Sequence, residues 1–153
     1  MFRRRNEVGA GNLHQQAAAV ERILAQLGIS VEQARMPVEN GYGWTFQRGS
    51  AVIEVYIAQV GGREYFQVLA PLIHLPTSGL LALYRRLLEL NLQLTNAALG
   101  VHQDVIFLFI ERPLVGLDAE EANFIITQIA EYADELDNQL LNEFGGRLYS
   151  QVN

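Results

Sequence analysis

The chain has 153 residues, of which 50% are hydrophobic and 18% are charged, a composition typical of one globular domain with its own core. Its formal net charge of -6 disfavours nucleic acid and anionic membranes as partners. Cysteine and lysine are both absent, which excludes disulfides, thiolate catalysis, cysteine-bound zinc and Schiff-base chemistry.

The N-terminal residues carry three consecutive arginines, Arg3, Arg4 and Arg5, followed by polar residues. A secretory signal would need an apolar block at this point, and no apolar run in the chain approaches the roughly 20 residues of a membrane span. We therefore expect a cytoplasmic protein without a membrane partner. Residues 1–11 are expected to form a flexible leader, because two glycines within them precede the first periodic segment.

The first helix is predicted from Asn12, a suitable N-cap, to Leu27, with Gly28 in the position that follows a helix end. Between these limits apolar side chains recur at helical spacing and define one buried face. They are Leu13, Ala17, Val20, Leu24 and Leu27.

After a polar connection the apolar period changes from 3.6 to two, which predicts strands. They lie around residues 44–47, 53–57 and 63–70. Gly61-Gly62 predicts a type I′ hairpin turn, because that turn needs positive φ at both central positions. Pro71 is expected to end the third strand.

A second helix is predicted from a cap at Thr77 or Ser78 to about Asn91. Two more strands follow, over about 97–101 and 105–111. The second of these is almost continuously apolar, which predicts a central place in the sheet.

The last helix is predicted from about Ala119 to Glu143. Asp118 and Glu121 form a capping box at its start, and Gly145-Gly146 ends it. Its predicted buried face contains Ala122, Ile125, Ile126, Ile129, Ala133, Leu136 and Leu140.

The element order is therefore α-β-β-β-α-β-β-α. Short turns between consecutive strands favour antiparallel pairing. The sequence predicts an α+β fold, in which helices pack on an antiparallel sheet of about five strands. We expect one domain over residues 12–146, followed by a tail of residues 147–153.

No group of side chains indicates catalysis or a cofactor. His14, His74 and His102 lie in separate predicted elements, and no two have the spacing of metal ligands. No serine lies in a nucleophile elbow. The carboxylates of the last helix, Glu131, Asp134, Glu135 and Asp137, are interpreted as a solvated acidic face. We therefore predict no enzymatic activity, no cofactor and no metal.

Apolar side chains cover about half of the second helix, whereas a surface helix needs a stripe only about 100° wide. One interpretation is that Leu83, Leu87 and Leu90 pack against a second subunit. The other is that this helix lies deep in its own core. The pattern leaves both open.

Phe124 is a second unusual residue, because it falls opposite the isoleucine face of the last helix. Exposed aromatic side chains are enriched at protein interfaces, which makes Phe124 a candidate contact. Alternatively, the loop around Leu114 and Leu117 covers it.

Two stretches carry a family resemblance. Leu87-Leu88-Glu89-Leu90-Asn91 leads into a hairpin, and Glu111-Arg112-Pro113-Leu114-Val115-Gly116-Leu117-Asp118-Ala119-Glu120-Glu121 leads into the last helix. With the element order over about residues 12–144, this resembles the YbjN family, grouped with the class I type III secretion chaperone-like fold. The resemblance implies a compact α+β sandwich, often a homodimer, without known enzymatic activity. Class I chaperones bind extended client segments on apolar patches, and YbjN-like proteins have been described as sensory or stress regulators.

We therefore predict a non-enzymatic protein-binding module, chaperone-like or a regulatory adapter, that acts as a homodimer. Its candidate interface residues are Leu83, Leu87, Leu90 and Phe124. The alternative is a small-ligand-binding protein or an enzyme with a site on the sheet. That site would use polar side chains of the strands, namely Glu54, Tyr56, Arg63, Tyr65 and His74.

Overall fold

The computed structural model describes the backbone of residues 3–151 and the side chains of residues 13–151. Its helices are α1 (Arg3–Gln26), α2 (Val31–Ala34), α3 (Leu80–Asn91) and α4 (Ala119–Phe144), with a short 3-10 helix at Tyr149–Gln151. Its strands are β1 (Arg35–Met36), β2 (Gly41–Arg48), β3 (Ala51–Val60), β4 (Arg63–His74), β5 (Ala98–His102), β6 (Val105–Pro113) and β7 (Arg147–Leu148).

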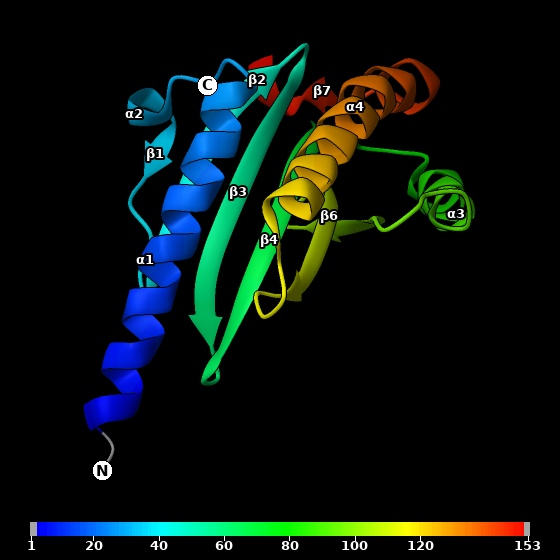
Figure 1. The fold of residues 1–153 in the computed structure, drawn as a ribbon. Helices are drawn as coiled ribbons and strands as arrows, with labels where there is room; N and C mark the ends of the chain where they lie inside the picture. The colour runs from blue at the N-terminus through cyan, green and yellow to red at the C-terminus, as the bar shows by residue number, and fades with distance from the viewer. Residues whose placement is uncertain (1–2, 152–153) are drawn as a thin grey trace.

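The strands form one antiparallel sheet in the order β1-β2-β3-β4-β6-β5, and β7 pairs with the end of β4. Helices α1 and α4 lie on one face of this sheet, and α3 lies at the β5 end (Figure 1). The predicted α+β fold with an antiparallel sheet is confirmed. The sheet has seven strands rather than about five, because β1 and β7 are too short to show an alternating pattern.

Helix α1 begins at Arg3, well before the expected Asn12. The expected flexible leader is therefore helical in its backbone from Arg3 onward, while residues 1–2 lie outside the described part. Glycine inside a helix costs only about 1 kcal/mol relative to alanine, so Gly9 and Gly11 do not by themselves end a helix.

Strand β4 continues through Pro71 to His74, beyond the end predicted at that proline. The register with β6 shifts between Pro71 and Ile73. Such an irregularity accommodates a residue that has no N–H to donate to the ladder. Arg147 and Leu148 are also paired, because β7 lies opposite Ile73 and His74, where the sequence indicated only a tail.

The hairpin glycines and the N-cap half of the predicted capping box are confirmed, while the Glu121 side chain pairs with Arg112 instead of reaching back to Asp118. Gly61 and Gly62 have φ of 57° and 78°, as a type I′ turn requires. At the start of α4 the Asp118 side chain accepts the N–H of Glu121 at 2.8 Å, which satisfies one of the free donors at a helix N-terminus.

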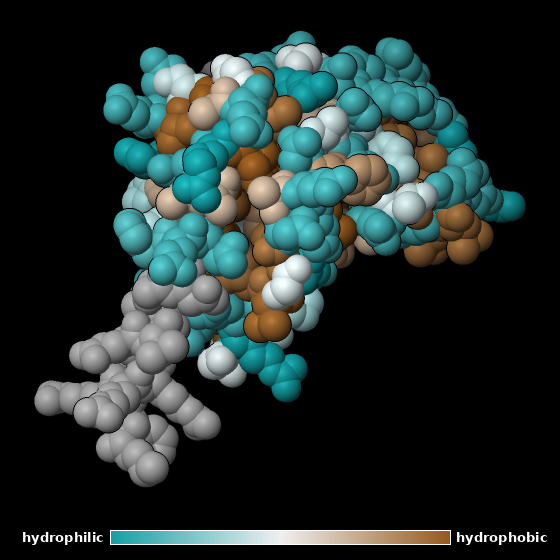
Figure 2. Space-filling view, viewed as in Figure 1, coloured by the Kyte–Doolittle hydropathy of each residue, from teal (hydrophilic) through white to brown (hydrophobic). Residues whose placement is uncertain are grey.

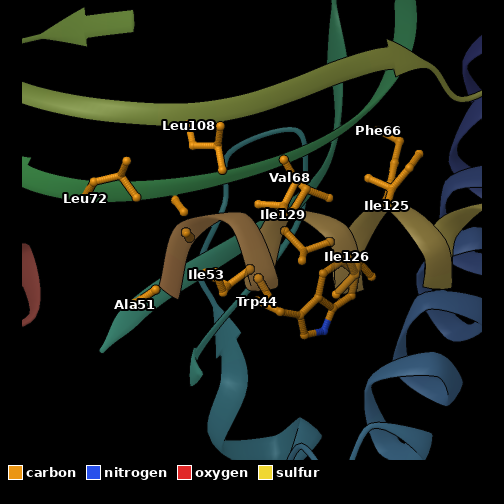
Figure 3. Packing of buried hydrophobic residues seen from close by; sticks show 14 of the residues in the cluster. Trp44, Ala51, Ile53, Phe66, Val68, Leu72, Leu108, Ile125, Ile126 and Ile129 are labelled. Atoms are coloured by element: carbon orange, nitrogen blue, oxygen red, sulfur yellow. The ribbon is translucent and has the colours of Figure 1, made fainter. Parts of the chain in front are cut away.

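The core lies between the sheet and helices α1 and α4. On the inner face of β3 every second residue is buried, as expected for a sheet covered on one side. Trp44, Ile53 and Ile126 point toward one another between the sheet and α4 (Figure 3). The buried face of α4 is confirmed and also includes two unpredicted residues, Ala130 and Asp137.

Candidate functional site

The predicted interface leucines of α3 do not lie on the surface of the chain. Leu83, Leu87 and Leu90 are at most 6% exposed and belong to the core. Helix α3 turns these residues inward beside β5. For these three side chains the structure therefore corresponds to the deep-core interpretation that the sequence left open.

The opposite edge of α3 carries the exposed apolar residues instead. Leu81 is 86% and Leu88 is 68% exposed, and Leu92, just after the helix, is 90% exposed. Figure 2 shows hydrophobic residues gathered over α3. The helical wheel could not distinguish the two edges, because apolar residues occupy both.

Ten large hydrophobic side chains are exposed within residues 13–151, and six of them lie between the start of α3 and β6. Four of these six follow one another at helical spacing along α3 and at its end. We call them the α3–β5 surface: Leu81, Tyr84, Leu88 and Leu92.

The sheet carries a separate hollow on its outer face. Phe109 follows the buried Leu108 in β6 and therefore points to the face away from α1 and α4. It lies opposite Leu69 of β4. These residues help to line a largely apolar hollow of about 270 Å³. The sequence indicated no such feature, because β6 is apolar at almost every position.

Phe124 lies on α4 in the exposed position that the sequence suggested. Its side chain is 56% exposed. Leu114 and Leu117 are buried and do not cover it. Phe124 lies in a hollow of about 730 Å³ lined by Asp118 and residues of α4, which are Glu120, Glu121, Asn123, Phe124, Thr127, Gln128, Glu131 and Tyr132.

A further hollow, of about 260 Å³, lies between α1, β1 and β2. At its wall the Glu21 carboxylate accepts hydrogen bonds from Arg35 Nε and Nη2, at 2.8 and 3.0 Å, and from Trp44 Nε1 at 3.1 Å. The hydrogen bonds from Arg35 lower the pKa of Glu21 below its usual value. The Tyr42 ring stacks on the Trp44 ring, with an angle of 13° between the two ring planes. This group joins three elements and has no sequence motif.

One member of the predicted solvated acidic face is buried. Asp137 is only 1% exposed, whereas Glu131, Asp134 and Glu135 are exposed. Its carboxylate lies against Ser50 of the β2–β3 turn. Burial raises the pKa of Asp137. The helical position of this residue could not reveal the turn that covers it.

The five residues of the alternative ligand site do not line any of the hollows described above. Tyr56 donates to Glu54 at 2.7 Å on the same strand, and His74 stacks on Tyr149. Among the described residues, no group of three or more histidine, aspartate or glutamate side chains is placed to hold a metal ion. None of the described helices has the length and apolar character needed to cross a membrane.

The family model for T3SS (YopN, CesT) and YbjN peptide-binding chaperone 1, abbreviated TY-Chap1, matches residues 14–152. The chain belongs to the TY-Chap1 family. The resemblance to YbjN and the type III secretion chaperones is thereby confirmed. No curated protein sequence matches the chain.

Solved structures share the TY-Chap1 fold of this chain. A chain of the ExsC–ExsE complex has a TM-score of 0.56 and 13% identity, covering 80% of this chain and 94% of its own. A chain of the heterodimeric ExoU–SpcU complex from the type III secretion system of Pseudomonas aeruginosa has a TM-score of 0.51 and 17% identity, covering 82% and 97%. At such identities the likeness shows the fold. YbjN from E. coli aligns with a TM-score of 0.47 and 15% identity, covering 78% and 89%.

Proposed function

We propose that this TY-Chap1 protein is a non-enzymatic peptide-binding module, a chaperone or regulatory adapter, that acts as a homodimer in the cytoplasm. The observation that carries the homodimer is the α3–β5 surface, which holds four of the ten large hydrophobic side chains exposed within residues 13–151. Contiguous exposed apolar patches of this kind mark interaction sites in soluble proteins. The description of the family supports the peptide-binding part.

Charge supports a second copy as the occupant of the α3–β5 surface. The chain as a whole has a net charge of -6, so two copies repel each other over most of their surfaces. Helix α3 differs, because it has two arginines and one glutamate. Arg85 pairs with Glu89 at 2.9 Å. A symmetric dimer through this helix brings apolar edges together without opposing like carboxylates.

The dimer is tested with a Leu81→Glu/Leu88→Glu double variant. Both side chains are exposed, so the change leaves the core intact. We expect sedimentation velocity to show a dimer for the original protein and a monomer for the variant, with unchanged circular dichroism. Val60→Glu/Val115→Glu is the matched control, since both valines are exposed elsewhere. A monomeric original protein, or a double variant that remains dimeric, would refute the dimer.

For the peptide, we propose the hollow between α1, β1 and β2. Strand β1, whose Arg35 and Met36 line this hollow, is the terminal strand of the described sheet, so its outer side is an edge. An extended peptide can add to such an edge while its side chains enter a neighbouring hollow. Tyr42 and Trp44 provide the apolar wall.

Trp44 reports directly on this site, because it is the only tryptophan of the chain. We expect its fluorescence to change saturably on titration with an extended apolar peptide. A Tyr42→Ala variant should bind less tightly, whereas Phe109→Ala, which removes an aromatic side chain of similar exposure from β6, should bind as the original does. Equal affinities for both variants would place the peptide elsewhere.

A further inference from the structure

One row of side chains runs along the exposed side of α4. Glu120, Phe124, Thr127 and Glu131 follow one another at spacings of four, three and four residues, so they line up on one side of the helix. The row is about 16 Å long, at a rise of 1.5 Å per residue. Phe124 is its large apolar member, and a carboxylate stands on either side of it.

The charges of this row are unbalanced. Among the described residues, neither Glu120 nor Glu131 forms an ion pair. No arginine lines the hollow. The adjacent Arg112 is already paired with Glu121 and donates to the carbonyl oxygens of Pro113 and Val115. The row therefore presents an exposed aromatic ring between two carboxylates that have no counterion among the described side chains.

A second copy of this chain fits the row poorly. If α4 packed on α4 of another copy, carboxylates would face carboxylates, which disfavours contact. A basic partner gains from the same charges. A partner helix has the same repeat as α4 and can place an apolar residue on Phe124 with cations on either side.

We propose that the row around Phe124 binds a basic amphipathic helix of a partner protein, through one apolar side chain on Phe124 and arginine or lysine side chains on Glu120 and Glu131. This rests on the proposed function, since it names the chemistry of a bound peptide. It uses a different surface from the α3–β5 surface and from the hollow beside α1.

The test measures fluorescence anisotropy of a labelled amphipathic helical peptide built of alanine, leucine and arginine, added to the full-length protein. We expect Phe124→Ala, and separately Glu120→Gln/Glu131→Gln, to weaken binding about tenfold. The control is Glu32→Gln/Glu39→Gln. It removes the same total charge at exposed positions near α2 and should change the affinity less than twofold. Binding should also weaken with added salt, because the pairs are exposed.

Three outcomes would overturn the inference. Equal weakening by both glutamine variants would show a general charge effect. Equal binding of a peptide with glutamate in place of arginine would show an apolar contact alone. Competition by a synthetic peptide of residues 1–12, which contains Arg3, Arg4 and Arg5, would make a second copy the occupant. The proposed function is checked on the same variants by sedimentation velocity for the dimer and by peptide titration followed by Trp44 fluorescence. If both are unchanged while the basic peptide does not bind, this inference fails alone.

Discussion

The Ser50 hydroxyl of the β2–β3 turn lies 2.9 and 2.8 Å from the two carboxylate oxygens of Asp137 on α4. Asn138 Nδ2 donates to the same hydroxyl at 2.8 Å, and the backbone N–H of Ser50 donates to Asp134 at 2.8 Å. A hydroxyl has one proton, so Ser50 can donate to only one of the nearby carboxylate oxygens at a time. The group fastens the turn to the helix and leaves Asp137 short of donors when it is ionised.

Stability should therefore fall with rising pH because of Asp137. Burial raises the pKa of Asp137 in the folded protein, whereas its pKa in the unfolded chain is about 3.9. Between these values the folded state holds a proton that the unfolded state has lost. The stability lost as pH rises through this window stays lost above the folded pKa.

The variant Asp137→Asn removes this titration. The free energy of unfolding can be measured with urea and Trp44 fluorescence. Its value for the variant should increase relative to that of the original protein as pH rises from about 4. Glu135→Gln, an exposed change on the same helix, should keep the original slope. Parallel pH curves for Asp137→Asn and the original would contradict the assignment.

Gly49 and Gly61 offer a matched pair, because both have φ of 57°. A Cβ at Gly61 would meet nothing within 4 Å, whereas a Cβ at Gly49 would lie 1.9 Å from Asp134 Oδ1. Gly61→Ala should cost about 1 kcal/mol from its left-handed backbone alone. Gly49→Ala should cost more in the free energy of unfolding, and Asp134→Ala in that background should recover part of the difference. Equal losses for the two glycines would show that the turn moves freely away from α4.

Leu83 and Leu88 separate the two sides of α3. Leu83 is fully buried and Leu88 is 68% exposed. Leu83→Glu places an unpaired carboxylate in the core, a change that consumes much of a typical stability of about 5–15 kcal/mol. Leu88→Glu should keep the thermal unfolding temperature by circular dichroism within a few degrees. If Leu88→Glu also unfolds the chain, the outer edge of α3 is part of the folded core.

Glu21 should stabilise the protein at neutral pH and not in acid. The pKa of Glu21 is lowered mainly by the hydrogen bonds from Arg35. Its contribution to stability is therefore present above its pKa in the unfolded chain, about 4.3, and is lost as pH falls through its pKa in the folded state. Glu21→Gln should cost about 0.5–1 kcal/mol at pH 7, given the exposure of the pair. A double-mutant cycle with Arg35→Ala checks this, and a coupling of zero would contradict it.

Local patterns predicted most of the fold. The 3.6 period placed α4 and its buried isoleucines, and Gly61-Gly62 identified a hairpin. The errors arose where a neighbouring element decides the outcome. Pro71 stays in its strand because a register shift with β6 accommodates it, and β7 exists only because β4 offers it a partner.

The same division holds for the candidate sites. By itself the sequence determined which helices carry excess apolar side chains, and it placed Phe124 away from the core, because helical geometry assigns a residue to a side of its own helix. Only the tertiary structure decided which side is covered. Leu83 is buried while Leu81 is exposed, since β5 and the core lie along one edge of α3. Asp137 is buried because a turn 87 residues earlier folds over it, and burial depends on contacts that no local pattern contains.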